Sequence, residues 1–295
     1  MKKTIGALLS LAVLCSSLFS SCKKDDDTTP PPVEPRLIFK FKFDSTQVRL
    51  DNLGNLSEIP SNHGAQSPRF NAMSAHYIEL TENQFTLPGA GTVLYHAPET
   101  TAGGSNAIDF SQSAAVGNGD TFFNIPIKDI NPGNYEWLRV SLAYQNYDID
   151  LRYTWSGINF DITGTLASFI GFNTFINNFQ IKDSTLSVNA NKLQGFWAFE
   201  TIYGVNQGQA PAGATTVPNP LFATSPIPQG SCLVTGDFEN PLVITGNETQ
   251  DIVVTVSLST NHSFEWVENS TPGYFEPAAG DAVVDMGIRG MKLTY

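Results

Sequence analysis

The chain has 295 residues, and its 16 lysines and arginines against 28 aspartates and glutamates give a formal net charge of −12. An acidic surface repels phosphate backbones and anionic headgroups, so we expect no nucleic-acid partner and no membrane adsorption through basic patches. The length suits one large domain or two small ones.

The first 21 residues have the pattern of a secretory signal. Lys2 and Lys3 form a positive start, residues 5–19 are mostly apolar but too few to span a bilayer, and two small serines precede Cys22. We expect residues 1–21 to be removed, and the loss of the two lysines would change the net charge from −12 to −14.

The run LFSSC at residues 18–22 resembles the lipobox of bacterial lipoproteins, in which the cysteine after the cleavage point is acylated. Two lysines and the acidic residues 25–27 follow, and this pattern resembles the export signal of Bacteroidota surface lipoproteins. The resemblance implies a lipid anchor at Cys22 and a location on the outer membrane, facing the exterior. Because Cys15 leaves with the signal and Cys22 is acylated, we expect Cys232 to form no intrachain disulfide.

Residues 22–36 are predicted to be the lipidated cysteine followed by an extended, proline-rich tether. Residues 37–43 then alternate apolar and basic side chains, which predicts a half-buried strand with Phe39, Phe41 and Phe43 inward. Further strands are predicted at 75–80, 92–96, 121–126, 136–144, 149–153, 158–162, 165–169, 174–181, 185–189, 195–203, 231–238, 242–244, 251–259 and 286–293.

Short strands separated by turn-forming residues predict an all-β fold, a large jelly-roll-like β-sandwich with long Gly/Pro-rich loops. We expect a single domain over residues 37–295. Residues 206–230 are rich in Gly, Ala, Thr and Pro, and they are either a long surface insertion, which we favour, or a crossing between two β domains.

Two sets of side chains are candidates for a metal site. The chain has four histidines, and a β-sandwich can bring His76, His96 and His262 together although they are far apart in sequence. Near the C-terminus, Glu276, Asp281 and Asp285 offer the oxygen ligands that calcium prefers. Copper or calcium is therefore a possible cofactor, and the alternative is that these are ordinary surface histidines and solvated acids.

Four segments, 37–43, 75–78, 125–135 and 138–142, resemble MbnP-like proteins over about residues 37–150. In that family a strand ends in a proline-glycine turn, a tyrosine follows, and another strand leads on. The resemblance implies a β-rich secreted protein, with copper bound by histidines and an oxidised tryptophan in some relatives.

Signals for catalysis are weak in this sequence. The segment around Ser231 lacks the second glycine of a hydrolase nucleophile elbow, and no histidine-glutamate zinc helix is present, so we expect a protein that is not an enzyme. If a catalytic carboxylate had to be named, Glu200 would be the choice.

Surface interactions with glycans have some support. Trp155, Trp197, Trp266, Tyr144 and Tyr147 either form a platform for sugar rings or fill the core. Thr28, Ser45 and Ser184 each follow an aspartate in a motif that resembles the Bacteroidota O-glycosylation signal.

The sequence as a whole predicts a cell-surface lipoprotein that acts as a non-catalytic binding or structural module for a glycan, peptide or protein partner. The first alternative is an MbnP-like copper-binding protein. Two further alternatives are a fimbria-type subunit that donates strand 37–43 after cleavage at Arg36, and an extracellular hydrolase.

Overall fold

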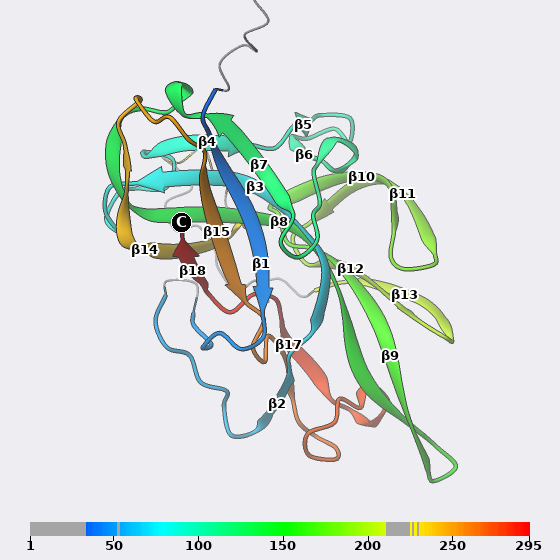
Figure 1. Ribbon diagram of the computed structural model, residues 1–295. Helices are drawn as coiled ribbons and strands as arrows, with labels where there is room; N and C mark the ends of the chain where they lie inside the picture. The colour runs from blue at the N-terminus through cyan, green and yellow to red at the C-terminus, as the bar shows by residue number, and fades with distance from the viewer. Residues whose placement is uncertain (1–33, 52–53, 211–224, 226, 229) are drawn as a thin grey trace, which may run out of the picture. The chain divides into compact units, whose positions relative to one another are not determined.

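The computed structural model describes residues 34–51, 54–210, 225, 227–228 and 230–295 (Figure 1). The predictions for the signal, for Cys22 and for Thr28 lie outside these residues. The described part of the chain is built of strands without an α-helix, and the predicted all-β sandwich is confirmed. None of the short 3-10 helices in these residues is long and apolar enough to cross a membrane.

The strands from the N-terminus to the middle of the chain are β1 (Arg36–Asp44), β2 (His63–Gln66), β3 (Arg69–Thr81), β4 (Thr92–His96), β5 (Glu99–Thr100), β6 (Ala107–Asp109), β7 (Thr121–Pro126), β8 (Gly133–Trp155) and β9 (Ile158–Phe169). The later strands are β10 (Asn173–Gln180), β11 (Thr185–Leu193), β12 (Phe196–Thr201), β13 (Gly204–Gln209), β14 (Cys232–Ile244), β15 (Ile252–Ser259), β16 (Phe264–Val267), β17 (Ala282–Met286) and β18 (Met291–Thr294). Within the described residues there are also three 3-10 helices, η1 (Phe110–Gln112), η2 (Ile127–Asp129) and η4 (Pro277–Ala279).

The largest sheet has eleven strands, and the long strand β8 organises it. β3 pairs along one edge of β8, while the other edge pairs first with β14 and then with β9. The sheet continues from β14 through β18, β15 and β1 to β7. In Figure 1, β1, β7 and β15 lie across β3, β4, β8 and β14, so this sheet folds over on itself as a sandwich.

The main core lies between these two layers. Leu37, Phe39 and Phe41 of β1 are fully buried and belong to the same cluster as Ile78 of β3 and Leu138 of β8. The predicted alternation of β1 is therefore confirmed. β1 is an interior strand, parallel to β15 on one side and antiparallel to β7 on the other, and this position counts against a strand donated between subunits.

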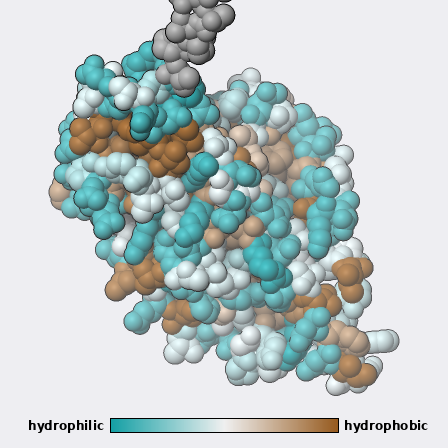
Figure 2. Space-filling view, viewed as in Figure 1, coloured by the Kyte–Doolittle hydropathy of each residue, from teal (hydrophilic) through white to brown (hydrophobic). Residues whose placement is uncertain are grey.

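In the described part of the chain, two smaller sheets cover the C-terminal half of β8. One has the order β11-β10-β6-β5, and the other has the order β17-β16-β2. The β8–β9 hairpin projects beyond these two sheets (Figure 1). Trp155 and Ile158 near the tip of the hairpin are exposed. In Figure 2, apolar residues are visible at the lower right of the molecule, where the hairpin lies.

Several predicted boundaries differ from the structure. Predicted strands 136–144 and 149–153 are parts of the single strand β8. The predicted strand 286–293 is interrupted, because Gly290 has a φ of +86° and the chain turns between β17 and β18. Residues 206–209 of the predicted insertion belong to β13, and residues 211–224, 226 and 229 lie outside the described residues.

Candidate metal centre

His76 lies at an irregularity in β3 that turns its side chain away from the main core. Ala75 and Tyr77 pair with the adjacent residues Leu142 and Ser141 of β8, so β3 carries one extra residue, His76, at this point. Such a β-bulge shifts the alternation of the strand. The apolar residues that face the main core change from odd positions (Met73, Ala75) to even positions (Ile78, Leu80) across the bulge.

His96 and Glu99 reach the same place from the next segment. β4 ends at His96, which pairs with Tyr77, and the backbone N–H of Ala97 donates to the carbonyl of His76 over 2.8 Å. Glu99 opens β5 three residues later. The antiparallel pairing of β3 with β4, followed by this short connection, therefore places both side chains beside His76.

The three side chains meet at one carboxylate oxygen. Glu99 Oε1 lies 2.8 Å from Nε2 of His76 and 3.1 Å from Nε2 of His96. Among the described residues, they form the group of three His, Cys, Asp or Glu side chains whose ligand atoms all lie within 4.8 Å of one another. Glu99 Oε2 accepts a 2.6 Å hydrogen bond from Asn106 Nδ2, which fixes the orientation of the carboxylate.

Aromatic packing holds the imidazole rings in place. The His76 ring contacts those of Tyr77 and Phe172, with centroids 4.8 and 5.2 Å away, and the Tyr77 ring stacks on that of His96 at 4.3 Å. Within the described part of the chain, Nδ1 of His76 is buried without a hydrogen-bond partner. Packing rather than a second hydrogen bond therefore orients this ring.

Burial and hydrogen bonding determine the charges at the site. His76 is fully buried, and the resulting desolvation lowers its pKa although the nearby Glu99 carboxylate opposes this effect. The pKa of Glu99 is lowered to about 2, chiefly by its hydrogen bond with His76. Near neutral pH the site thus holds a neutral imidazole and a carboxylate, which are the protonation states that bind metals.

Solvent reaches the group from one side. The side chain of His96 is 43% exposed and that of Glu99 is 22% exposed, whereas His76 forms the closed back of the site. An ion held here would keep coordination positions directed toward solvent, as catalytic and transport sites do.

His262 does not belong to this group. It lies in the turn after β15, where its backbone N–H donates to Ser67 Oγ and its carbonyl accepts from Arg49 Nη1. The predicted trio of histidines is therefore corrected: His76 and His96 meet, and Glu99 supplies the third side chain. The spacing of His96 and Glu99, separated by Ala97 and Pro98, is the sequence signal that was available for Glu99.

The C-terminal acids are used by the loop that contains them. Asp281 accepts hydrogen bonds from the backbone N–H groups of Asn269 and Glu276 over 2.8 and 2.7 Å, and Glu276 accepts one from Thr271 over 3.0 Å. Asp285 lies in β17 and forms an ion pair with Arg289. These contacts fold the loop and its strand, and calcium binding by the three acids stays a prediction.

The remaining candidates from the sequence are a possible catalytic carboxylate, two glycosylation sites and five aromatic residues. Glu200 accepts hydrogen bonds from the turn between β10 and β11, including one from the Ser184 hydroxyl, so both residues help to hold this turn. Ser45 is exposed. Of the five aromatic residues considered for sugar binding, Tyr144, Tyr147 and Trp266 are buried, which is the core alternative, while Trp155 is exposed.

A comparison of the chain with known protein families, curated proteins and solved structures finds no match.

Proposed function

We propose that the protein binds one divalent transition-metal ion through His76, His96 and Glu99. The observation that carries this proposal is the convergence of two imidazoles and a carboxylate at one point, with a buried back and an open front. Imidazole suits copper, zinc, iron and nickel, and the usual order of affinities places Cu²⁺ above Zn²⁺. The sequence resemblance to MbnP-like proteins also supports copper.

The two nitrogen–oxygen distances are compatible with an ion after a small adjustment. Bonds of about 2.0–2.1 Å in a tetrahedral arrangement separate neighbouring ligand atoms by about 3.3 Å. The two nitrogen–oxygen distances are 2.8 and 3.1 Å, so the side chains would move apart by a few tenths of an ångström. His96 can make this movement because its side chain is 43% exposed.

The proposal is tested with the mature chain, residues 22–295, carrying Cys22→Ser so that an unacylated thiol cannot bind metal. We expect one ion per chain by mass spectrometry, a Cu²⁺ spectrum with coupling to two nitrogens, tighter binding of Cu²⁺ than of Zn²⁺, and a thermal melt that shifts to lower temperature with chelator.

Variants identify the ligands in the same experiment. His96→Asn and Glu99→Gln should each weaken binding by at least about tenfold, since even the partners of metal ligands are worth about 10–100-fold. The matched control is His262→Asn, which removes an exposed histidine outside the site and should leave affinity unchanged. Equal affinity of all three variants, or no bound metal, would refute the site.

We further propose that acylation of Cys22 holds this metal-binding domain at the outer membrane. The supporting observations are the lipobox-like run at residues 18–22 and the acidic residues that follow it. Several acyl chains give stable membrane anchoring, whereas one is only marginal. Cys22→Ala should therefore move the protein from the membrane fraction to the soluble fraction, and unchanged membrane association of this variant would contradict the proposal.

A further inference from the structure

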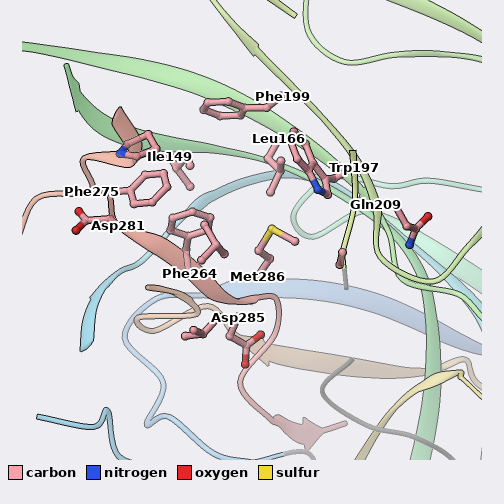
Figure 3. A pocket seen from close by; sticks show the side chains of 14 residues that line it. Ile149, Leu166, Trp197, Phe199, Gln209, Phe264, Phe275, Asp281, Asp285 and Met286 are labelled. Atoms are coloured by element: carbon pink, nitrogen blue, oxygen red, sulfur yellow. The ribbon is translucent and has the colours of Figure 1, made fainter. Parts of the chain in front are cut away.

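The fold contains a cavity that is separate from the candidate metal centre. This partly open cavity of about 420 Å³ lies between the sheet formed by β8, β9 and β12 on one side and the segment from β16 to β17 on the other (Figure 3). Its size falls within the range of about 300–1,000 Å³ that is usual for small-molecule sites. The metal centre is built by β3, β4 and β5 and shares no lining residue with this cavity.

Aromatic rings form the wall on the sheet side. Phe199 and Trp197 project from β12, and each ring lies over a glycine of the neighbouring strand. A Cβ atom at Gly164 of β9 would overlap the Phe199 ring, and one at Gly208 of β13 would lie 2.7 Å from the Trp197 ring. The two glycines therefore allow both rings to lie close to the sheet, which leaves room above them.

The opposite wall is also aromatic and apolar. Phe264 of β16 and Phe275 of the following loop pack edge to face with ring centroids 5.0 Å apart, and Met286 of β17 lies beside them. Figure 3 shows Trp197 and Phe199 on one side of the space, with these three side chains on the other. Both walls offer surfaces that suit a flat apolar molecule, since aromatic rings favour stacked and edge-to-face contacts.

Polar groups are few and lie at the edges of the cavity. Asp281 and Asp285 provide carboxylates, and Gln209 provides an amide. Asp281 is fixed by its loop hydrogen bonds, and Asp285 is fixed by its ion pair with Arg289. Ionised carboxylates only accept hydrogen bonds and have about four acceptor positions, so a bound molecule is best matched here by a donor group.

We propose that this cavity binds a small aromatic molecule of two or three rings that carries a hydrogen-bond donor. The volume of the cavity sets the size, the two walls select aromatic surface, and the acidic edge selects an N–H or O–H group and disfavours anions. This binding is independent of the metal centre.

The test uses N-phenyl-1-naphthylamine, an uncharged aromatic probe with one N–H that fluoresces when shielded from water. The mature chain with Cys22→Ser contains every described residue and needs no detergent. We expect saturable fluorescence with one probe per chain. 2-Phenylnaphthalene, which lacks the N–H, should compete about threefold to tenfold more weakly than the probe binds, as expected for loss of one hydrogen bond. No saturable binding, or equal affinity of the two compounds, would overturn the proposal.

Matched variants locate the probe. Val283 lines the cavity and is 39% exposed, while Val253 on β15 is 40% exposed and lies outside the cavity. Val283→Trp should reduce probe affinity at least tenfold, and Val253→Trp should leave it unchanged. If Val283→Trp does not fold, Phe199→Leu replaces it and should weaken binding severalfold. Loss of binding in Trp155→Ala instead would place the probe on the exposed hairpin and refute the cavity.

Discussion

Glu265 is a buried carboxylate that contacts three basic side chains. Its Oε1 lies 2.5 Å from His63 Nδ1, and its Oε2 accepts hydrogen bonds from Arg49 and from Arg289 Nη2, the latter over 2.8 Å. Burial alone would raise its pKa, but the hydrogen bonds from His63 and Arg49 and the positive charges nearby outweigh that effect and lower it. Glu265 of β16 therefore links His63 of β2, Arg49 in the connection from β1 to β2, and Arg289 in the connection from β17 to β18.

Removing the negative charge of Glu265 should destabilise the fold. Glu265→Gln keeps the shape of the side chain but leaves the buried Arg49 without its carboxylate, and we expect a loss of about 3 kcal/mol in the free energy of unfolding. Urea denaturation measures this loss. The control is Asp150→Asn, which breaks the ion pair between Asp150 and Arg69. These two side chains are 59% and 54% exposed, respectively, so the variant should lose less than about 1 kcal/mol in the free energy of unfolding. Similar losses in the two variants would contradict the structural role of Glu265.

At the scale of strands, local patterns predicted which segments are extended but not how they pair. Residues 92–96 and 121–126 are strands with the predicted bounds, because β-branched and aromatic residues mark them clearly. β13, with sequence GVNQGQ, was missed since its polar and glycine residues lack that pattern. The strand is held by pairing with β12, which the local sequence does not encode.

The metal centre shows the same limit. His76 and His96 were recognised from residue type alone, yet their meeting depends on the pairing of β3 with β4 and on the bulge at His76. Both features arise from contacts between distant segments. The three-residue spacing of His96 and Glu99 does not by itself identify a ligand, and an exposed turn histidine such as His262 looks the same in sequence as a ligand.

For the whole molecule, the excess of acidic groups is accommodated by hydrogen bonds and ion pairs that favour their charged forms. The carboxyl groups with lowered pKa values are Asp44, Glu99, Asp150, Asp161, Glu200, Glu248, Glu265 and Glu276. A carboxyl group whose pKa is lower in the folded state stabilises the fold above its unfolded pKa, and this contribution is lost as the pH falls. Stability should therefore decrease as the pH falls below about 4.5.

Asp285 should contribute to the pH dependence of stability with the opposite sign. Burial raises its pKa to about 6, although the positive charges of Arg289 and Arg49 oppose the change and the negative charge of Glu265 adds to it. The folded state therefore keeps a proton on Asp285 between about pH 4 and 6 that the unfolded state has released, so this group's contribution to stability falls as the pH rises through that window.

Asp285→Asn isolates this contribution, because the amide does not titrate. The difference in unfolding free energy, parent minus variant, should fall by on the order of 2 kcal/mol between pH 4 and 7 and then stay constant up to pH 8. Urea denaturation of both proteins at each pH measures it. All other ionisable groups are common to both proteins, so their contributions largely cancel in the difference. A difference that is constant from pH 4 to 6 would show that Asp285 is ionised throughout this range, and that Arg289 rather than burial determines its charge.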